Sequence, residues 1–196
     1  LGSELVNGLS SLNYHIYAND INFSYKINKN KKIILLKENL LSNKHKININ
    51  NCDIFIHTCA LTKTYKDKNK NLFKVNMKLT RKALILAKQL NCKKFFFISS
   101  TSVYRKFSKY KYNEKSKTSA QDSYSKSKLK GEKISKEICN KHKIKLTILR
   151  IGNIYSGHEK IKWSRLNVSQ IQKWINDNKK NKILKTSNFD TLRDWT

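Results

Sequence analysis

The hydrophobic pattern divides the chain into short apolar runs and longer amphipathic segments. The runs have the length of single strands, and some are apolar at consecutive positions, which is typical of strands buried on both faces of a sheet. The longer segments carry apolar residues three or four positions apart, which predicts helices. The predicted apolar faces are formed by Leu5, Leu9 and Leu12 in the first helix and by Leu79, Ala83, Leu86 and Leu90 in the second. Strands are predicted at 15–20, 31–37, 51–60, 93–100 and 145–150, and helices at about 2–12, 71–90 and 124–142.

The order of these elements predicts the fold class. Strands and helices alternate along the chain, an arrangement typical of a parallel sheet covered by helices. We therefore predict an α/β fold. From residue 156 onward the pattern loosens, and a helix near 167–178 with a short strand near 183–184 predicts the beginning of a smaller lobe.

Composition adds a strong positive charge. The 196 residues include 42 Lys and Arg against 13 Asp and Glu, which gives a formal net charge of +29. Only five of the basic residues are Arg, the usual reader of bases. The lysines are spread along the chain and accompany many Asn and Ile residues, whose codons are also A/T-rich. We interpret the charge as compositional drift and rank nucleic-acid binding last.

Cysteines and apolar runs do not favour a metal site or a membrane segment. The four cysteines are scattered, and none forms a CxxC pair or stands at zinc-finger spacing from a histidine. Reduced thiols in a cytoplasmic protein are the plain interpretation. No stretch approaches the roughly 20 apolar residues that span a bilayer, and the first residues lack a secretory signal pattern. We expect no metal and no membrane contact.

Small and polar residues follow the predicted strands at their carboxyl ends. Asp20 ends one strand, His-Thr-Cys-Ala at 57–60 ends another, two serines at 99–100 end a third, and Gly-Asn follows the last at 152–153. Ligands of open parallel sheets bind outside the carboxyl ends of the strands. The sequence therefore predicts a ligand site at this edge.

A tyrosine and a lysine stand four residues apart at the start of the predicted helix 124–142. Side chains at this spacing share one helical face, so Tyr124 and Lys128 could act together on one small molecule. A nearby ammonium favours the phenolate, so we expect Lys128 to lower the pKa of Tyr124 and to create a proton-transfer group. The spacing alone is a weak signal, because Tyr25 and Lys29 share it.

The chain resembles the extended short-chain dehydrogenases/reductases, in particular the NAD-dependent epimerase/dehydratase family. The matching pieces occur in the family's order and span nearly the whole chain: GSELVNGL, Asp20, DIFIHTCA, FFFISSTSVY, YSKSKLKGE, LRIGNIYSG and LRDWT. The specific part is FISSTSVY followed by YSKSK. The resemblance implies a doubly wound Rossmann-type sheet, with an NAD-binding domain at 1–155 and the beginning of a substrate-binding lobe at 156–196.

The resemblance also implies roles for the matching residues. Tyr124 is the expected acid/base toward a sugar hydroxyl, Lys128 binds the nicotinamide ribose, and Ser100 hydrogen-bonds the same substrate oxygen. The implied catalytic residues are Ser100, Tyr124 and Lys128; the cofactor-binding residues are Gly2, Asp20, Asn39, Leu40, Thr58, Cys59, Ala60, Ser99, Tyr124, Lys128 and Gly152; the substrate-binding residues are Ser100, Asn153 and Arg193.

Asp20 bears on the choice of cofactor. A carboxylate after the second strand of a dinucleotide fold accepts hydrogen bonds from the adenosine ribose and repels a 2′-phosphate, which favours NAD over NADP. Asn39 stands where the family usually has Asp, and an amide can still hydrogen-bond. Of the Gly-rich phosphate-binding turn the chain contains only the last glycine, Gly2.

Several functional alternatives stay open. The implied activity is an NAD-dependent epimerase or oxidoreductase acting on a nucleotide sugar, and a homodimer is compatible with it. Dehydratases of the family usually carry an acidic pair where Thr101 and Ser102 stand, so dehydration is less favoured. A non-catalytic dinucleotide-binding regulator is the other alternative, although such proteins tend to lose the Tyr/Lys pair. The family's first strand and most of its substrate-binding lobe have no counterpart in this chain. We therefore expect a fragment that is inactive alone and has an open slot in its sheet where that strand would lie.

Overall fold

The structure is a computed structural model. It describes residues 1–12, 14–23, 27, 30–42, 47, 49–62, 71–104 and 112–152. The chain separates into two compact units, Leu1–Leu149 and Arg150–Thr196. The predicted helix at 167–178, the predicted strand at 183–184 and the predicted domain boundary after 155 lie outside the described residues and stay predictions.

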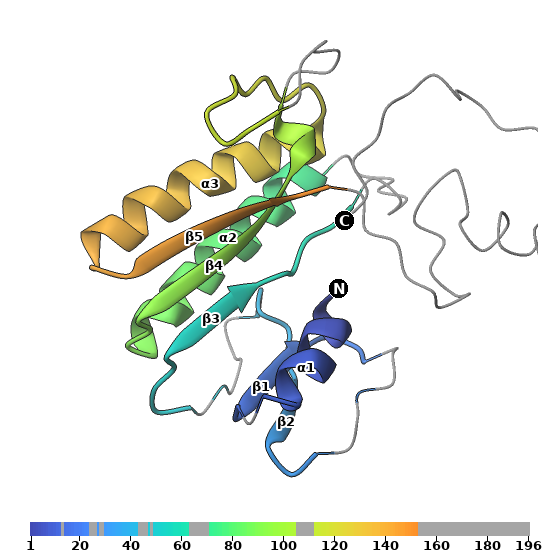
Figure 1. Cartoon of the computed structure of the whole chain (residues 1–196), viewed down its shortest axis with the longest axis vertical. Coiled ribbons are helices and arrows are strands. Elements are labelled where there is room, and N and C mark those ends of the chain that lie inside the picture. The colour runs from blue at the N-terminus through green and yellow to red at the C-terminus, as the bar shows by residue number, and fades with distance from the viewer. Residues whose placement is uncertain are drawn as a thin grey trace, which may run out of the picture. The chain divides into compact units, whose positions relative to one another are not determined.

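Strands and helices alternate as predicted (Figure 1). Most predicted elements are present, with ends displaced by a few residues. The predicted strand 51–60 is shorter, because its polar and small residues after His57 leave the ladder. The described elements are α1 (Gly2–Ser10), β1 (Ile16–Asp20), β2 (Ile33–Lys37), β3 (Ile54–His57), α2 (Leu72–Gln89), β4 (Lys94–Ser100), the short 3-10 helix η1 (Thr101–Val103), α3 (Ser123–Lys141) and β5 (Lys145–Ile151).

Helix α1 ends earlier than its apolar spacing predicts. The hydroxyls of Ser10 and Ser11 donate to the carbonyls of Asn7 and Gly8, each at 2.7 Å, so side chains satisfy the last turn in place of further helical bonds. Leu12, predicted to lie on the apolar face of the helix, follows in a turn and is 65% exposed.

The strands form two separate hydrogen-bonded groups. β1 pairs with β2 in parallel, with Ile16 opposite Ile33, and β3 pairs with β4 in parallel, with Ile54 opposite Lys94. β5 joins the second group on the far side of β4, in the order β3-β4-β5. In the described part of the chain no strand joins β1 to β3. The predicted break in the sheet at this position is confirmed.

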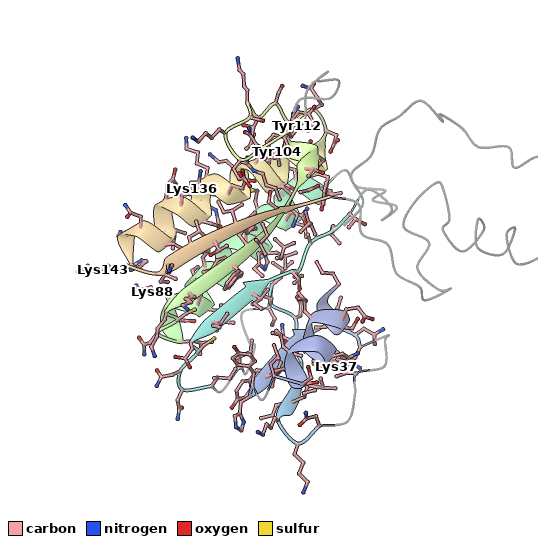
Figure 2. The ribbon with its side chains drawn as sticks, viewed as in Figure 1. Lys37, Lys88, Tyr104, Tyr112, Lys136 and Lys143 are labelled. Carbon is pink, nitrogen blue, oxygen red and sulfur yellow. The ribbon has the colours of Figure 1, made fainter. Side chains whose placement is uncertain are left out.

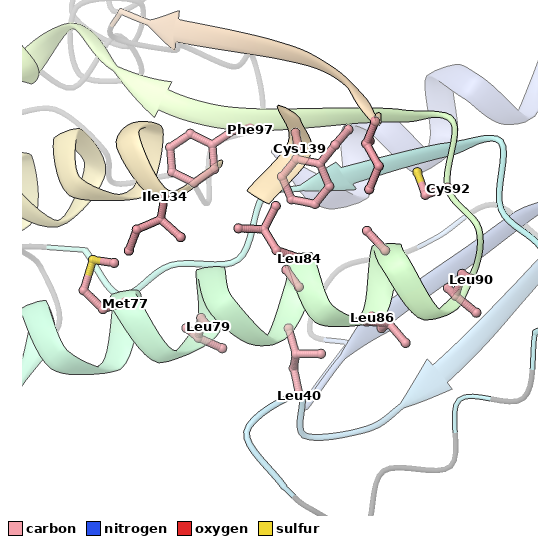
Figure 3. Close-up of a cluster of buried hydrophobic side chains, with 14 residues drawn as sticks. Leu40, Met77, Leu79, Leu84, Leu86, Leu90, Cys92, Phe97, Ile134 and Cys139 are labelled. Carbon is pink, nitrogen blue, oxygen red and sulfur yellow. The ribbon is translucent and has the colours of Figure 1, made fainter. Parts of the chain in front are cut away.

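Helices α2 and α3 pack against each other, and α3 packs on β4 (Figure 1). The predicted apolar stripe of α2 faces this core, where the rings of Phe95 and Phe97 from β4 are almost completely buried (Figure 3). From α3, Ile134 is buried, Ile138 packs at the margin, and Leu129 is half-buried. The stripe residues Leu79, Ala83, Leu86 and Leu90 are all buried.

A capping box fixes the start of α3. The Asp122 carboxylate accepts the backbone N–H of Ser125 at 2.9 Å, and the Ser125 hydroxyl accepts the N–H of Asp122 at 3.2 Å. The helix therefore begins at Ser123, and Tyr124 lies in its first turn.

Close packing fixes the distance of α3 from β4. A Cβ placed on Gly131 would stand 2.5 Å from the ring of Phe97, so only glycine allows this approach of helix to strand. Lys128, one turn earlier on the same helix, is thereby held against the end of β4.

The lysines described by the structure are distributed over separate elements. Lys37, Lys88 and Lys136 are exposed on β2, α2 and α3, and Lys143 is exposed in the turn between α3 and β5, where it lies near Lys88 in this view (Figure 2). In the described residues no helix is both long enough and apolar enough to cross a bilayer.

Candidate active site

Lys128 is the buried cation of the site. It is 5% exposed, and its Nζ donates to the carbonyl oxygen of Ile98 near the end of β4, at 2.8 Å. The same Nζ lies 5.4 Å from the centre of the Phe97 ring and 5.7 Å from the centre of the Tyr124 ring. A lysine has three N–H donors. The bond to Ile98 therefore orients the ammonium and leaves donors available for a ligand.

Burial determines the protonation of this centre. It lowers the pKa of Lys128 to about 8, an effect partly opposed by Cys59. Burial, with a smaller contribution from Lys128, lowers the pKa of His57 to about 3, so this imidazole is neutral at physiological pH. Its Nε2 lies 3.4 Å from the Thr80 hydroxyl. His57 therefore adds shape and polarity next to Lys128 but no charge.

The depressed pKa of Lys128 predicts a pH-dependent stability. Between pH 8 and about 10.5 the unfolded chain binds more protons than the folded chain. The free energy of unfolding of the parent therefore increases as the pH rises through this range. Lys128→Met removes the buried charge and should increase the free energy of unfolding at pH 7 by about 1–3 kcal/mol. This advantage should shrink steadily as the pH approaches 10.

Urea unfolding of the parent and Lys128→Met at pH 7, 8.5 and 10 measures this difference. Lys126→Met is the matched control, because Lys126 is exposed on the same helix. Its stability difference from the parent should be constant over that range. A Lys128→Met difference that does not change with pH would contradict the assignment.

Tyr124 does not have the predicted protonation. Burial and, to a lesser extent, the Asp122 carboxylate raise its pKa above the ordinary value for tyrosine. The expected lowering by Lys128 is therefore wrong for this structure. The physical reason is position: the ammonium is tied to the carbonyl of Ile98 and lies by the ring, while Asp122 stands at the start of the tyrosine's own helix.

The two serines that end β4 have different environments. Ser99 is 1% exposed and donates its hydroxyl to the buried Glu132 at 2.6 Å, so its side chain has a structural partner inside the protein. The hydroxyl oxygen of half-buried Ser100 accepts the backbone N–H of Ser102 at 3.2 Å. Because that bond uses only the oxygen, Ser100 keeps a hydrogen that it can donate to a substrate.

The ends of β1 and β3 meet the start of α1 and the Lys128 side chain. The pKa of Cys59 is raised by burial and by Asp20 and is lowered by Lys128, so both charged side chains are within electrostatic range of Cys59. A Cβ on Gly2 would stand 3.5 Å from the Thr58 hydroxyl. Residues from the end of β1, the segment after β3, the start of α1 and the first turns of α3 thus lie near one another. The strand-end pattern predicts such a grouping.

The other predicted cofactor residues are more scattered. Asn39 is exposed and accepts the Leu41 N–H at 3.0 Å, whereas Leu40 is 8% exposed and packs in the hydrophobic core. Ala60 and Gly152 are half-buried. The predicted substrate residues Asn153 and Arg193 lie outside the described residues.

Asn76 is a site residue that the sequence reasoning missed. It is 4% exposed; its amide accepts the Leu61 N–H at 2.8 Å and donates to the Leu61 carbonyl at 3.0 Å. It also donates to the Ser127 hydroxyl at 3.1 Å, and this hydroxyl donates to the Tyr124 carbonyl at 2.7 Å. Asn76 therefore connects α2 to the segment after β3 and to the turn of α3 that carries Tyr124 and Lys128. The sequence did contain a signal for this role. Asn76 is a polar residue seven positions before Ala83, so it lies on the otherwise apolar face of α2.

Aromatic packing joins Tyr104, the residue after η1, to Tyr112. The rings of Tyr104 and Tyr112 stack with centres 4.8 Å apart and an interplanar angle of 6° (Figure 2). Ser119 N–H also donates to the Val103 carbonyl at 2.9 Å, which ties the approach to α3 to the end of β4.

Comparison with protein families identifies the chain. The pattern of the NAD-dependent epimerase/dehydratase family matches residues 1–196. The chain belongs to this family. A search of curated proteins finds no significant sequence match.

Solved structures of epimerases share the fold of this family member. The UDP-N-acetylglucosamine 4-epimerase from Methanobrevibacter ruminantium M1, in complex with UDP-N-acetylmuramic acid, matches with a TM-score of 0.79 at 20% identity, over 100% of this chain and 64% of its own. An epimerase from Methanothermobacter thermautotrophicus matches with a TM-score of 0.77 at 20% identity, over 100% of this chain and 60% of its own.

The UDP-glucuronic acid 4-epimerase from Bacillus cereus, in complex with UDP-glucuronic acid and NAD, is also similar. It matches with a TM-score of 0.69 at 21% identity, over 88% of this chain and 60% of its own. The chain thus spans 64% or less of the length of each of these three epimerases. At these identities the likeness shows the fold, which is the predicted Rossmann-like α/β fold.

Proposed function

We propose that this family member is an NAD-dependent epimerase of nucleotide sugars, with Tyr124 as its acid/base. The observation that carries the proposal is the Lys128 ammonium, held by the Ile98 carbonyl beside the Tyr124 ring. This places a cation with available donors and a phenol together at the carboxyl edge of the sheet, where Rossmann-type proteins bind their ligands.

The residues present fit NAD at three points. The start of α1 has no side-chain cap, and Gly2 has no side chain there, so its backbone N–H can donate to a phosphate oxygen. Asp20 is exposed at the end of β1 and can accept hydrogen bonds from a ribose diol. Lys128 can donate to the second ribose. We further assign Asn39 and Leu40 to the adenine, and Thr58, Cys59, Ala60, Ser99 and Gly152 to the cofactor wall.

The proposed chemistry divides between cofactor and chain. When bound, NAD would supply reversible hydride transfer at the carbon that carries the reacting hydroxyl. Tyr124 takes the proton of that hydroxyl and gives it back, and Ser100 donates a hydrogen bond to the same oxygen. Asn153 and Arg193 are proposed to hold the substrate, Arg193 through the diphosphate.

Epimerisation is favoured over dehydration by the residues that follow Ser100. Elimination of water needs an additional acid/base for a second carbon of the sugar. Thr101 and Ser102 form η1 at this position, and neither side chain titrates in the physiological range. UDP-sugars are the substrate class we favour, because the similar structures hold UDP-N-acetylmuramic acid and UDP-glucuronic acid.

The test is incubation of the protein, as its gene encodes it, with NAD and a panel of UDP-sugars. Products are separated by chromatography and weighed by mass spectrometry. An epimer of unchanged mass supports the proposal, whereas loss of water would establish a dehydratase. NAD binding without turnover of any nucleotide sugar would favour the regulatory alternative and overturn the proposal.

A further inference from the structure

Two cysteines stand side by side at the opposite end of the sheet from the candidate active site. Cys52 precedes β3 and Cys92 precedes β4, and each lies two residues before a member of the paired positions Ile54 and Lys94. Continuing this parallel register places the two cysteines opposite each other. Each sulfur also lies 3.0 Å from the carbonyl oxygen two residues later, that of Ile54 for Cys52 and that of Lys94 for Cys92.

Backbone and sulfur contacts place the two thiols next to each other. The Cys92 sulfur lies 4.0 Å from the carbonyl oxygen of Asp53, the residue that follows Cys52. Backbone bonds hold the segments on both sides: Cys52 N–H donates to Leu90 at 2.9 Å and Lys94 N–H donates to Asp53 at 3.0 Å. Neighbouring strands lie about 4.8 Å apart, and disulfides join Cα atoms about 4.4–6.8 Å apart. Little backbone movement is therefore needed to join the sulfurs.

A small oxidant has a route to the pair. Cys92 is 5% exposed and belongs to the hydrophobic core at the turn between α2 and β4 (Figure 3), but Cys52 is only half-buried and packs against that core. The third nearby thiol, Cys139, is 1% exposed and belongs to the hydrophobic core. The geometry therefore distinguishes one reactive pair from a buried neighbour.

We propose that Cys52 and Cys92 are an oxidation site that forms an intramolecular disulfide with a hydroperoxide. One thiolate of the pair attacks the peroxide, the O–O bond breaks, and hydroxide leaves, which produces a sulfenic acid on that sulfur. The second thiol attacks this sulfur, the S–S bond forms, and water leaves. Overall two thiols lose two electrons and two protons, and hydrogen peroxide is reduced to two water molecules.

The protonation of the pair supports this reaction. The Cys52 thiol donates to Cys92 and, together with backbone donors, lowers the pKa of Cys92 to about 7 against the opposing effect of burial. One member of the pair therefore carries a substantial thiolate fraction at neutral pH, and the thiolate is the nucleophile. The neighbouring Cys52 thiol stabilises this Cys92 thiolate. It is also in position to attack the sulfenic acid that forms on Cys92.

The disulfide would close a loop that contains β3, the segment 58–62 and α2. Because the closed loop is long, cross-linking should restrict the unfolded chain and raise Tm by about 5 °C or more. The proposal is independent of the activity assigned to the other end of the sheet.

The experiment uses a Cys59→Ser background, because no Lys or Arg separates Cys52 from Cys59 and trypsin would leave both in one peptide. The reduced protein is treated with hydrogen peroxide, alkylated, weighed intact, and digested without reduction. We expect the number of alkylatable thiols to fall by two, a linked pair of peptides carrying Cys52 and Cys92, and full reversal by dithiothreitol.

Cys52→Ala and Cys92→Ala in the same background are the control variants. Either substitution should abolish the linked peptides and the Tm increase. If Cys92→Ala does not fold, because it removes a buried side chain, the result for Cys52→Ala is the one that counts. Two results would overturn the proposal: a link from Cys92 to Cys139, or peroxide oxidation of the folded protein that leaves Cys52 and Cys92 unlinked.

Discussion

Replacing Tyr124 with phenylalanine should lower kcat for a nucleotide sugar by about 10²–10⁴-fold, the usual contribution of a positioned acid/base. The substitution removes one oxygen and keeps the ring that stands 5.7 Å from Lys128 Nζ. The packing of the first turn of α3 is therefore retained. Because Lys128 and Asp20 are unchanged, NAD affinity should stay within about threefold of the parent value, well under the 1.4 kcal/mol that corresponds to tenfold.

The pH profile provides a second readout of Tyr124. Burial and Asp122 raise its pKa in this structure, so the phenol is protonated at neutral pH. If ionised Tyr124 is the base, kcat/KM should increase with pH in the alkaline direction, and this limb should be absent from the residual activity of Tyr124→Phe.

Tyr25→Phe is the matched control for this experiment. Tyr25 and Lys29 have the same sequence spacing as Tyr124 and Lys128, and the substitution removes the same atom. It should leave kcat within twofold, an effect of about 0.4 kcal/mol. Equal activity of Tyr124→Phe and Tyr25→Phe would refute the catalytic assignment.

Replacing Asn76 with alanine should lower the free energy of unfolding by about 2–4 kcal/mol. The amide is buried and satisfies both the N–H and the carbonyl of Leu61, besides donating to Ser127. Its removal leaves the N–H and the carbonyl of half-buried Leu61 without these partners, and the desolvation penalty of unpaired polar groups adds to the loss of the bonds themselves.

Chemical denaturation measures the effect, with Asn140→Ala as the control. Asn140 is exposed on α3, and only its backbone carbonyl takes part in the bonds described for it. Its replacement should change the free energy of unfolding by less than about 0.5 kcal/mol. If Asn76→Ala were equally harmless, the amide would not connect α2 to the active-site turn as described.

Much of the fold was predictable from local patterns. The stripe of α2 at Leu79, Ala83, Leu86 and Leu90 is buried as predicted, because one helical face carries nearly all its large apolar residues. The consecutive apolar residues of β4 likewise predicted a strand in the core. Errors arose where side chains compete with the backbone, as the serine hydroxyls do at the end of α1.

The candidate site was predictable only in part. Helical spacing brought Tyr124 and Lys128 to one face, but the direction of the Tyr124 pKa shift was wrong. A pKa depends on burial and on the distances to all nearby charges, and the bond from Lys128 to Ile98 joins residues 30 positions apart in the chain. No local pattern encodes such a contact.

The family, the alternation of strands and helices, and the residue types at the strand ends could be predicted from the chain alone, because periodicity and motif order are local properties. Which of these residues meet depends on the folded structure. Folding brings Asp20 and Lys128 within electrostatic range of Cys59, buries Ser99 with Glu132, and places Cys52 beside Cys92. Such encounters depend on how strands are aligned and how closely Gly131 lets α3 approach Phe97, and these are consequences of packing in three dimensions.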